Sequence, residues 1–176
     1  QDEVRGIPAA SQGGPVAAEE DAAGACDGVR TGSFGFHTAR EDQPWWQVDL
    51  GGEHPLTGLK IYNRVACCQE KARTMQVLLS TDGSNWRKTY SHDGSTFKVL
   101  TVDLTGQNAR YVKLQLAEKN FLHFQECEVY GYPTVEPVAQ SGVSAYAGVY
   151  PVTLTLSKAM PSGMALDPSG KVLFIA

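Results

Sequence analysis

The sequence alternates short β-prone runs with turn-forming dipeptides and offers no clean helical period over twelve residues. Val112, Leu114 and Leu116 alternate with polar neighbours, which is the pattern of a strand with one buried face. The strand-like runs are 46–50, 59–62, 75–79, 97–104 and 111–116, and Asp-Gly turns occur at 27–28, 82–83 and 93–94. This pattern predicts an all-β fold, an antiparallel β-sandwich.

The composition of the chain changes after Tyr132-Pro133, where it becomes polar and contains further proline. Residues 1–133 are predicted to form the sandwich and 134–142 a linker, while 144–156 and 162–176 contain more strand-like runs. Residues 161–176 resemble one strand pair of a β-propeller blade. Residues 134–176 are too few for an independent β domain. We expect a short C-terminal β extension that packs on the sandwich, pairs with a neighbouring molecule, or begins a larger region.

Charge and motifs narrow the class of protein. Fifteen basic and 19 acidic residues give a net charge of −4 with no long run of either sign, so we expect no nucleic-acid partner. No apolar stretch is long enough for a membrane span, and we expect no membrane insertion. The recognisable hydrolase, metalloprotease and phosphate-binding motifs are absent, which predicts a non-catalytic protein. The chain begins with Gln1, as expected of a processed protein.

The four cysteines allow three pairings when all are oxidised. Two of them, Cys67 and Cys68, are adjacent. Consecutive Cα atoms lie about 3.8 Å apart, whereas ordinary disulfides span roughly 4.4–6.8 Å, so a Cys67–Cys68 bond needs a strained eight-membered ring. The alternative is that these two cysteines point to opposite faces of a strand and bond separately to Cys26 and Cys127. Either arrangement favours an oxidised, secreted protein over a zinc site, because no Cys-x-x-Cys spacing occurs.

Basic residues flank the adjacent cysteines in the stretch NRVACCQEK, residues 63–71. A histidine, His37, precedes Arg64 by 26 intervening residues, and Lys71 falls seven positions after Arg64. This arrangement resembles the F-type lectins, or fucolectins, of the coagulation-factor 5/8 type C (discoidin-like) superfamily, whose motif is a histidine followed by Arg-x-Asp-x-x-x-x-(Arg/Lys). The resemblance extends over 1–133 through ACDG at 25–28, STDGSNW at 80–86, ARYVKL at 109–114 and LHFQECEVYGY at 122–132. It implies a jelly-roll, galactose-binding-domain-like sandwich.

The resemblance implies that His37, Arg64 and Lys71 bind L-fucose through its axial 4-hydroxyl, its 3-hydroxyl and its ring oxygen. A fork-shaped guanidinium supplies two donors at once, which suits a hydroxyl pair of fixed stereochemistry. A Cys67–Cys68 ring would hold the two cations apart and offer an apolar surface. Phe34 or Phe36 would complete a shelf for the sugar methyl group. Trp45 and Trp46 are expected to pack in and around the core rather than to stack on sugar.

One residue departs from the family motif. Ala66 stands where the family has an aspartate beside the sugar-binding cations. The guanidinium of Arg64 therefore lacks an orienting carboxylate, which is worth about 1–3 kcal/mol where water is excluded. This puts the affinity or specificity of the site in question, but not the fold.

The resemblance also implies a structural calcium ion. Its carboxylate ligands would be Asp27 and Glu128, and hard oxygen ligands of this kind suit Ca²⁺. The backbone carbonyls that map to the family's site are those of Gly24, Val29, Ser33 and Cys127. Cys26 and Cys127 each adjoin one carboxylate ligand, so a bond between them is the expected second disulfide.

Two functions follow from these observations. The first is a secreted lectin for fucosylated glycans, for which useful avidity requires a homo-oligomer or repeated domains. The second is a discoidin-like adhesion or assembly module that has lost sugar binding, with residues 134–176 completing a sheet edge on a neighbouring subunit.

Overall fold

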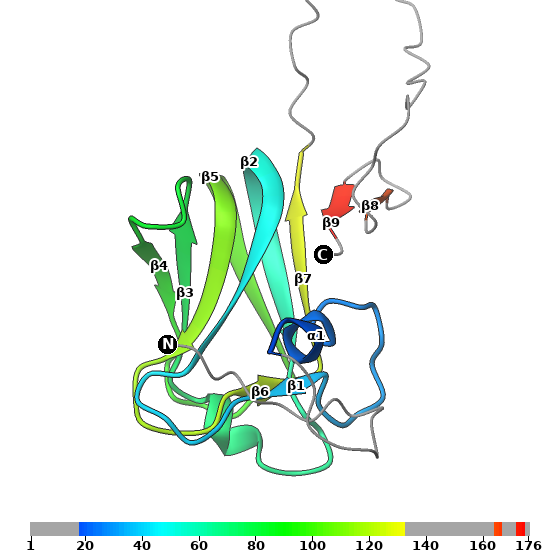
Figure 1. The fold of residues 1–176 in the computed structure, drawn as a ribbon, viewed down its shortest axis with the longest axis vertical. Coiled ribbons are helices and arrows are strands. Elements are labelled where there is room, and N and C mark those ends of the chain that lie inside the picture. Colours follow the sequence, from blue (N-terminus) through cyan, green and yellow to red (C-terminus); the bar gives the residue numbers. More distant parts are fainter. Residues whose placement is uncertain (1–17, 133–163, 167–171, 175–176) are drawn as a thin grey trace, which may run out of the picture.

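The computed structural model describes residues 18–132, 164–166 and 172–174 (Figure 1). In these segments the chain is almost entirely β-structure, with one short helix and one 3₁₀ turn. The elements in chain order are α1 (Ala18–Ala23), β1 (Phe36–His37), β2 (Trp45–Tyr62), η1 (Gln69–Ala72), β3 (Met75–Ser80), β4 (Arg87–Ser91), β5 (Val99–Leu116), β6 (His123–Phe124), β7 (Glu126–Gly131), β8 (Met164–Leu166) and β9 (Val172–Phe174). Among the described helices, none is long and apolar enough to cross a membrane.

Two strands of 18 residues each, β2 and β5, build both layers of the molecule. They pair antiparallel from Trp45↔Gln115 to Asp49↔Tyr111, and again from His54↔Ala109 to Tyr62↔Val99 after a shift of register. The chain bends over at the shift, where Gly51 has a φ of 80°. Strands β3 and β4 extend the first half of the pair, and β7 extends the second half, in the order β4-β3-β5-β2-β7-β9-β8. The predicted antiparallel β-sandwich is confirmed (Figure 1).

The core lies between the layers and follows the alternation of the sequence. On β2, Trp46, Val48 and Leu50 are buried, while Gln47 and Asp49 are exposed. The facing strands contribute aliphatic side chains in the same alternation. Those that are fully buried include Leu59, Ile61, Met75, Val77, Val112, Leu114 and Leu116.

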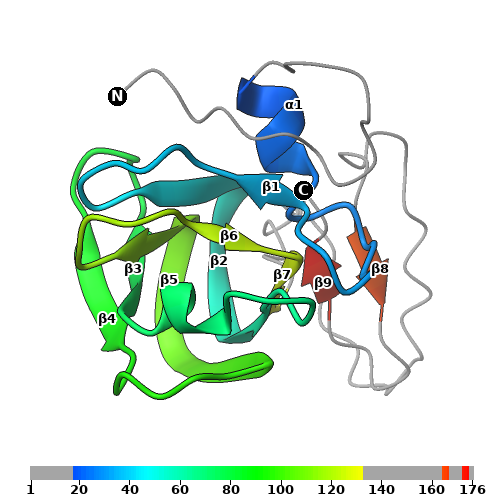
Figure 2. The ribbon, with the colours of Figure 1, turned by 90° about the horizontal axis from the view of Figure 1, so that it is seen from below.

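A small sheet closes one end of the sandwich. Strand β1 pairs antiparallel with β6, through Phe36↔Phe124 and His37↔His123. Helix α1 lies beside β1, and η1 lies against β6 (Figure 2). The loops that the sequence analysis selected for sugar binding meet at this end.

The extents of several elements differ from the sequence prediction. The runs 46–50 and 59–62 belong to one continuous strand, as do most of 97–104 and 111–116, because the register shifts in the pairing of β2 with β5 bend the two strands without ending them. Helix α1, the 3₁₀ turn η1 and strands β1, β4, β6 and β7 are not among the predicted runs.

The C-terminal extension adds strands to the sheet edge. Strand β9 pairs antiparallel with β7, and β8 pairs with β9, so the strand pair predicted within 161–176 is present. Of the three expected arrangements, the structure shows packing on the protein's own sandwich for these strands. The predicted linker at 134–142 and the strand-like run 144–156 lie outside the described residues.

Candidate functional site

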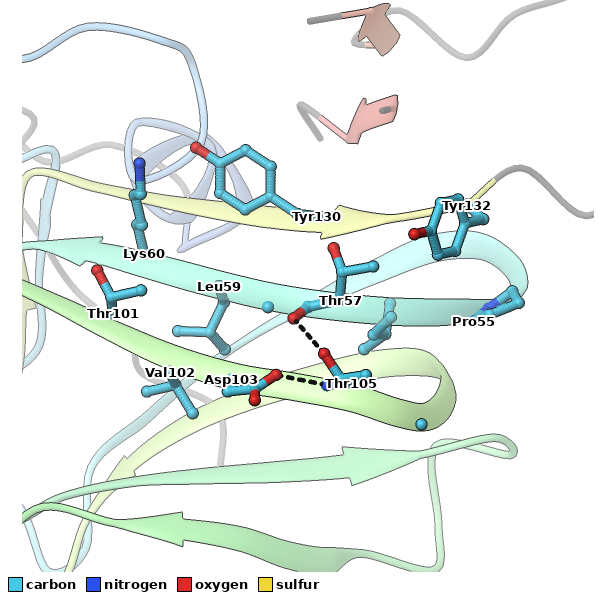
Figure 3. Close-up of a pocket in the computed structure, with 13 residues that line it drawn as sticks. Pro55, Thr57, Leu59, Lys60, Thr101, Val102, Asp103, Thr105, Tyr130 and Tyr132 are labelled. Carbon is cyan, nitrogen blue, oxygen red and sulfur yellow. Dashed lines mark hydrogen bonds between the residues drawn. The ribbon is translucent and has the colours of Figure 1, made fainter. Parts of the chain in front are cut away.

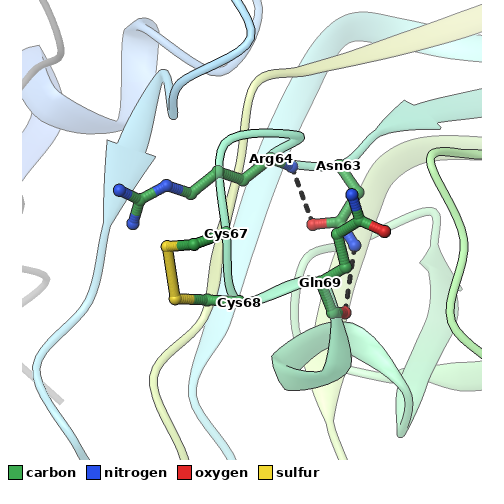
Figure 4. The surroundings of a disulfide bond; sticks show 5 residues. All are labelled: Asn63, Arg64, Cys67, Cys68 and Gln69. Atoms are coloured by element: carbon green, nitrogen blue, oxygen red, sulfur yellow. Dashed lines mark hydrogen bonds between the residues drawn. A yellow bond between two sulfur atoms is a disulfide. The ribbon is translucent and has the colours of Figure 1, made fainter.

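The adjacent cysteines form a disulfide with each other. Cys67 and Cys68 are bonded, with their Cα atoms 3.8 Å apart and Cys68 in a left-handed conformation at a φ of 65°. The alternative in which each bonds to a remote cysteine is wrong. In Figure 4 the Arg64 side chain and the two sulfur atoms extend from the same side of the loop. The strained ring therefore stands beside the guanidinium, as the sequence predicts.

Hydrogen bonds of the Asn63 side chain and of the backbone fix the loop that carries the Cys67–Cys68 ring. The side chain of Asn63 is buried, accepts from the N–H of Arg64 at 2.8 Å, and donates to the carbonyls of Gln69 and Phe97 at 3.1 Å each (Figure 4). The N–H groups of residues 65 and 66 both donate to the carbonyl of Gly32, at 3.0 and 3.2 Å. The loop after β2 is thus joined to the loop that precedes His37.

The second predicted disulfide, Cys26–Cys127, is not formed. Both residues are buried thiols. Their segments are nevertheless adjacent, since the N–H of Cys127 donates to the carbonyl of Ala25 at 2.7 Å. The Sγ of Cys26 instead donates to the carbonyl of Ala23 at 3.5 Å, back into its own turn. Burial, followed by the charge of Cys26 and of neighbouring carboxylates, raises the pKa of the Cys127 thiol.

His37 lies on β1 with its ring among three aromatic neighbours. Ring centroids of Phe34, Phe121 and His123 lie 5.3, 5.4 and 5.2 Å from that of His37, and the His123 ring is stacked on it. Its Nδ1 is 2.6 Å from the carbonyl of Thr38. A carbonyl only accepts, so Nδ1 carries the proton and Nε2 of the neutral ring is a hydrogen-bond acceptor. Burial lowers the pKa of His37, and the nearby charge of Arg64 lowers it further, which favours this neutral ring.

The two cations lie over the aromatic residues that flank His37. The guanidinium carbon of Arg64 is 4.9 Å from the Phe34 ring centroid, and Nζ of Lys71 is 5.9 Å from that of Phe121. Both cationic side chains are half-buried. Each contact is a cation–π interaction that fixes where a flexible cation stands.

His123 lies beside His37, and the two rings are stacked with their centroids 5.2 Å apart. The side chain of His123 is buried, and its Nδ1 has no hydrogen-bond partner among the described residues. Burial lowers the pKa of His123 to about 4, with smaller contributions from the positive charges of His37, Arg64 and Lys71. His37, Arg64 and Lys71 come from separate segments, and the structure brings them together through the aromatic rings of Phe34 and Phe121, which contact the two cations and flank His37. Sequence reasoning missed His123 and Phe121, because neither belongs to the spacing motif.

Phe36 was predicted as an alternative shelf for the sugar methyl group, and the structure excludes it. Its side chain is fully buried and packs on Phe124 and Trp46, with centroids 4.8 and 6.5 Å away. Residues alternate faces on β1, so Phe36 points into the core while His37 points away from it. Phe34 lies in the loop before β1 and stays half-buried beside His37 and Arg64. The buried Trp46 is core packing, as predicted.

The Arg64 side chain contains a polar atom without a hydrogen-bond partner in the part of the chain that the structure describes. The Nε atom of Arg64 is buried and has no hydrogen-bond partner among the described residues. Ala66, at the motif's acidic position, is exposed and takes part through its backbone N–H. A buried donor without an acceptor costs about 1–3 kcal/mol.

The predicted calcium ligands lie around the loop between α1 and β1. Asp27 accepts from the N–H of Val29 at 2.8 Å. Glu128 accepts from the hydroxyls of Tyr62 and Tyr130 through Oε2, and its Oε1 is 3.4 Å from Nη1 of Arg30. The described residues contain no group of three or more His, Cys, Asp or Glu side chains arranged to hold a metal ion. Calcium would therefore depend on backbone carbonyls such as those of Gly24, Val29, Ser33 and Cys127.

A third carboxylate, Glu126, was not predicted and faces the same loop. Its Oε1 accepts from the N–H of Gly28 at 3.1 Å, while its buried Oε2 has no partner among the described residues. Burial raises the pKa of Glu126 to about 7, and the charges of Asp27 and Glu128 raise it as well. An unpartnered carboxylate oxygen is the kind of ligand that a hard cation prefers. Asp27, Glu126 and Glu128 do not form a three-acid site by themselves, so backbone carbonyls would have to supply the remaining ligands. The alternation of β7 places Glu126 and Glu128 on one face, a signal that could have revealed this residue.

A groove of about 570 Å³ lies elsewhere on the molecule. It is lined by parts of β2, β5 and β7, including Lys60, Asp103, Tyr130 and Tyr132 (Figure 3). None of the residues predicted to bind sugar lines it.

Comparisons with known proteins agree with the fold. The family described as NedA-like, galactose-binding domain matches residues 24–114. The chain is 31% identical to fucolectin-6 of Anguilla japonica over 101 residues, which cover 53% of the chain and 52% of the relative. The chain thus spans about half the length of this relative.

Two solved structures share the fold. A fucose binding module of Streptococcus pneumoniae, SpX-3, has a TM-score of 0.57 at 26% identity, covering 62% of this chain and 83% of the module. A serum fucolectin of Morone saxatilis has a TM-score of 0.58 at 26% identity, covering 76% of this chain and 50% of the fucolectin.

Proposed function

Because the chain belongs to the NedA-like, galactose-binding domain family of the factor 5/8 type C class, we propose that it is a non-catalytic lectin domain that binds L-fucose in fucosylated glycans. One observation carries the proposal. His37, Arg64 and Lys71 stand at the spacing of the fucolectin motif and come from three segments. Arg64 contacts Phe34, Lys71 contacts Phe121, and both of these aromatic rings lie beside that of His37. The names of the fucolectin and fucose-module relatives support the same ligand.

We propose a role for each side chain. Neutral His37 offers Nε2 as an acceptor for a sugar hydroxyl, while Arg64 and Lys71 donate to hydroxyl and ring oxygens. Phe34, Phe121 and the Cys67–Cys68 ring are the apolar groups available to the methyl group that distinguishes fucose from galactose. We expect a monosaccharide Kd of about 0.1–1 mM, because one small site gains only about −4 to −5.5 kcal/mol.

Titration calorimetry with methyl α-L-fucoside tests the site. Arg64→Ala should abolish measurable binding and leave the melting temperature nearly unchanged, because the Arg64 side chain makes no ion pair with a described residue. Arg87→Ala on β4 is the matched control, since Arg87 is an exposed arginine that bonds to Gln107 away from the site. Methyl α-L-galactoside, which replaces the methyl group by a hydroxymethyl group, should bind more weakly. Full fucoside affinity in Arg64→Ala would refute the proposed site.

We also propose a structural calcium ion in the loop that leads to β1, held by Asp27, Glu126 and Glu128 together with backbone carbonyls. The orphaned Glu126 Oε2 supports it. Calcium at 100 times its Kd should stabilise the fold by about 2.7 kcal/mol. Scanning calorimetry with calcium, with magnesium and with chelator measures this, and Glu126→Gln should reduce the response. Equal melting temperatures with calcium and with chelator would contradict the proposal.

One observation favours the second function, an adhesion or assembly module without sugar binding: the Arg64 Nε that Ala66 leaves without an acceptor. In that case no glycan would bind, and deletion of 134–176 would convert an oligomer to monomers in light scattering. For the lectin, deletion should leave fucoside affinity intact. We propose secretion for both functions, since an exposed disulfide persists in oxidising compartments.

A further inference from the structure

The sugar site contains two cations whose charge is not balanced. Arg64 and Lys71 form no ion pair with any described residue. Asp21 is fully buried, and its Oδ2 accepts from the backbone N–H of His37 at 3.1 Å. Glu70, the neighbour of Lys71 in η1, is exposed. Burial lowers the pKa of His123, and the neighbouring His37 and the positive charges of Arg64 and Lys71 lower it further.

Building on the lectin function above, we propose that the natural ligand carries an anionic oxygen, a sulfate ester or a carboxylate, on or beside the bound fucose. The anion would occupy the electrostatic place that the motif's aspartate fills in related sites and that Ala66 leaves open. Its oxygen would accept from the terminal nitrogens of the Arg64 guanidinium, because Nε itself is buried from solvent.

The positive charges of Arg64 and Lys71 favour an anion over a neutral hydroxyl as the hydrogen-bond acceptor for Arg64. A ligand that covers the site removes water from both cations, and an uncompensated charge is costly to desolvate. A neutral sugar would leave both cations unbalanced, whereas one anionic oxygen makes a charge-assisted hydrogen bond of roughly twice the usual strength. The chain as a whole carries a charge of −4, so general attraction of anions is not expected.

The test compares neutral and charged forms of one sugar. Titration calorimetry on the full chain would use methyl α-L-fucoside, each of its monosulfate esters, and a fucosylated oligosaccharide with and without a sialic acid carboxylate. We expect at least one anionic form to bind about tenfold or more tightly than its neutral counterpart. That preference should shrink at high salt, because screening weakens the charge interaction. The sulfate and carboxylate arms identify which anion the site takes.

Substitutions at Ala66 assign the preference to the missing carboxylate. Ala66→Asp should tighten binding of the neutral fucoside and remove most of the preference for the anion. Ala66→Asn is the matched uncharged control and should keep the preference. Thr81→Asp adds the same charge at an exposed turn after β3 and should also keep it. Ala66 is exposed and bonds through its backbone, so these variants should fold.

Two results would overturn the inference. Equal affinity for neutral and anionic fucosides, unaffected by Ala66→Asp, would overturn it and leave the lectin function standing. No binding of any fucosylated probe, charged or neutral, would overturn the lectin function and this inference with it.

Discussion

Substitution of Phe36 separates core packing from sugar contact. The Phe36 side chain is fully buried against Phe124 and Trp46. Truncating such a ring to alanine costs about 3–5 kcal/mol, against a total stability of about 5–15 kcal/mol for a domain. With a urea dependence of about 2 kcal/mol/M, the midpoint of unfolding should fall by about 2 M. Urea unfolding of Phe36→Ala, followed by the fluorescence of the buried Trp46, measures this loss.

Phe34→Ala is the matched comparison, because Phe34 is half-buried two residues earlier and contacts Arg64 and His37. It should cost less than about 1 kcal/mol of stability but weaken methyl α-L-fucoside about fivefold, the worth of one cation–π contact. The reasoning is refuted if Phe36→Ala keeps its unfolding midpoint and loses fucoside binding, since Phe36 would then be the shelf and not the core.

Further predictions concern the site's frame. Gly35→Ala should cost about 1–3 kcal/mol and weaken fucoside binding, because its Cβ would collide with the carbonyls of Gly24 and Gln125, which cannot yield as side chains do; an unchanged melting temperature would contradict this. In the folded protein the pKa of His123 is lowered from 6.5 to about 4. Between about pH 6.5 and 4, His123 is therefore protonated in the unfolded chain but neutral in the folded protein. Up to about 3 kcal/mol of stability should be lost as pH falls through that range, and urea titrations of His123→Gln should show a flatter dependence on pH. Replacing Cys67 and Cys68 by serine should change the unfolding free energy by less than about 1 kcal/mol, because the bond closes no long loop, but should weaken fucoside binding; a large loss of stability with intact binding would show that the ring is purely structural.

The sequence predicted what local patterns encode. Alternation and turn chemistry gave the sandwich, and the spacing of His37, Arg64 and Lys71 gave the residues that meet at its end. His123 and Phe121 were not predicted as site residues, because the pairing of β6 with β1 brings them to the site. That pairing joins segments 86 residues apart, and no local sequence pattern indicates it. Phe36 was misplaced because a strand of two residues is too short for its alternation to show which face is buried.

The bounds of β2 and β5 also depend on tertiary structure. Each strand bends between the layers at a shift of register, and bulges of this kind interrupt the pattern of period two without ending the strand. The surroundings of the loop near Asp27 likewise depend on tertiary packing. Sequence alone did not show that Glu126 is buried there with one oxygen unpartnered, because that depends on how β7 packs against the loop.

The continuity of β2 and β5 through both layers has a kinetic consequence. Trp45 pairs with Gln115 in one layer and Tyr62 with Val99 in the other, so neither layer exists until distant stretches of chain have met. Such non-local pairing places folding in the range of milliseconds to seconds. It also makes the unfolding of the two layers cooperative. Cleavage of β2 or β5, or a shift of register in either strand, should unfold both layers together without a partly folded intermediate.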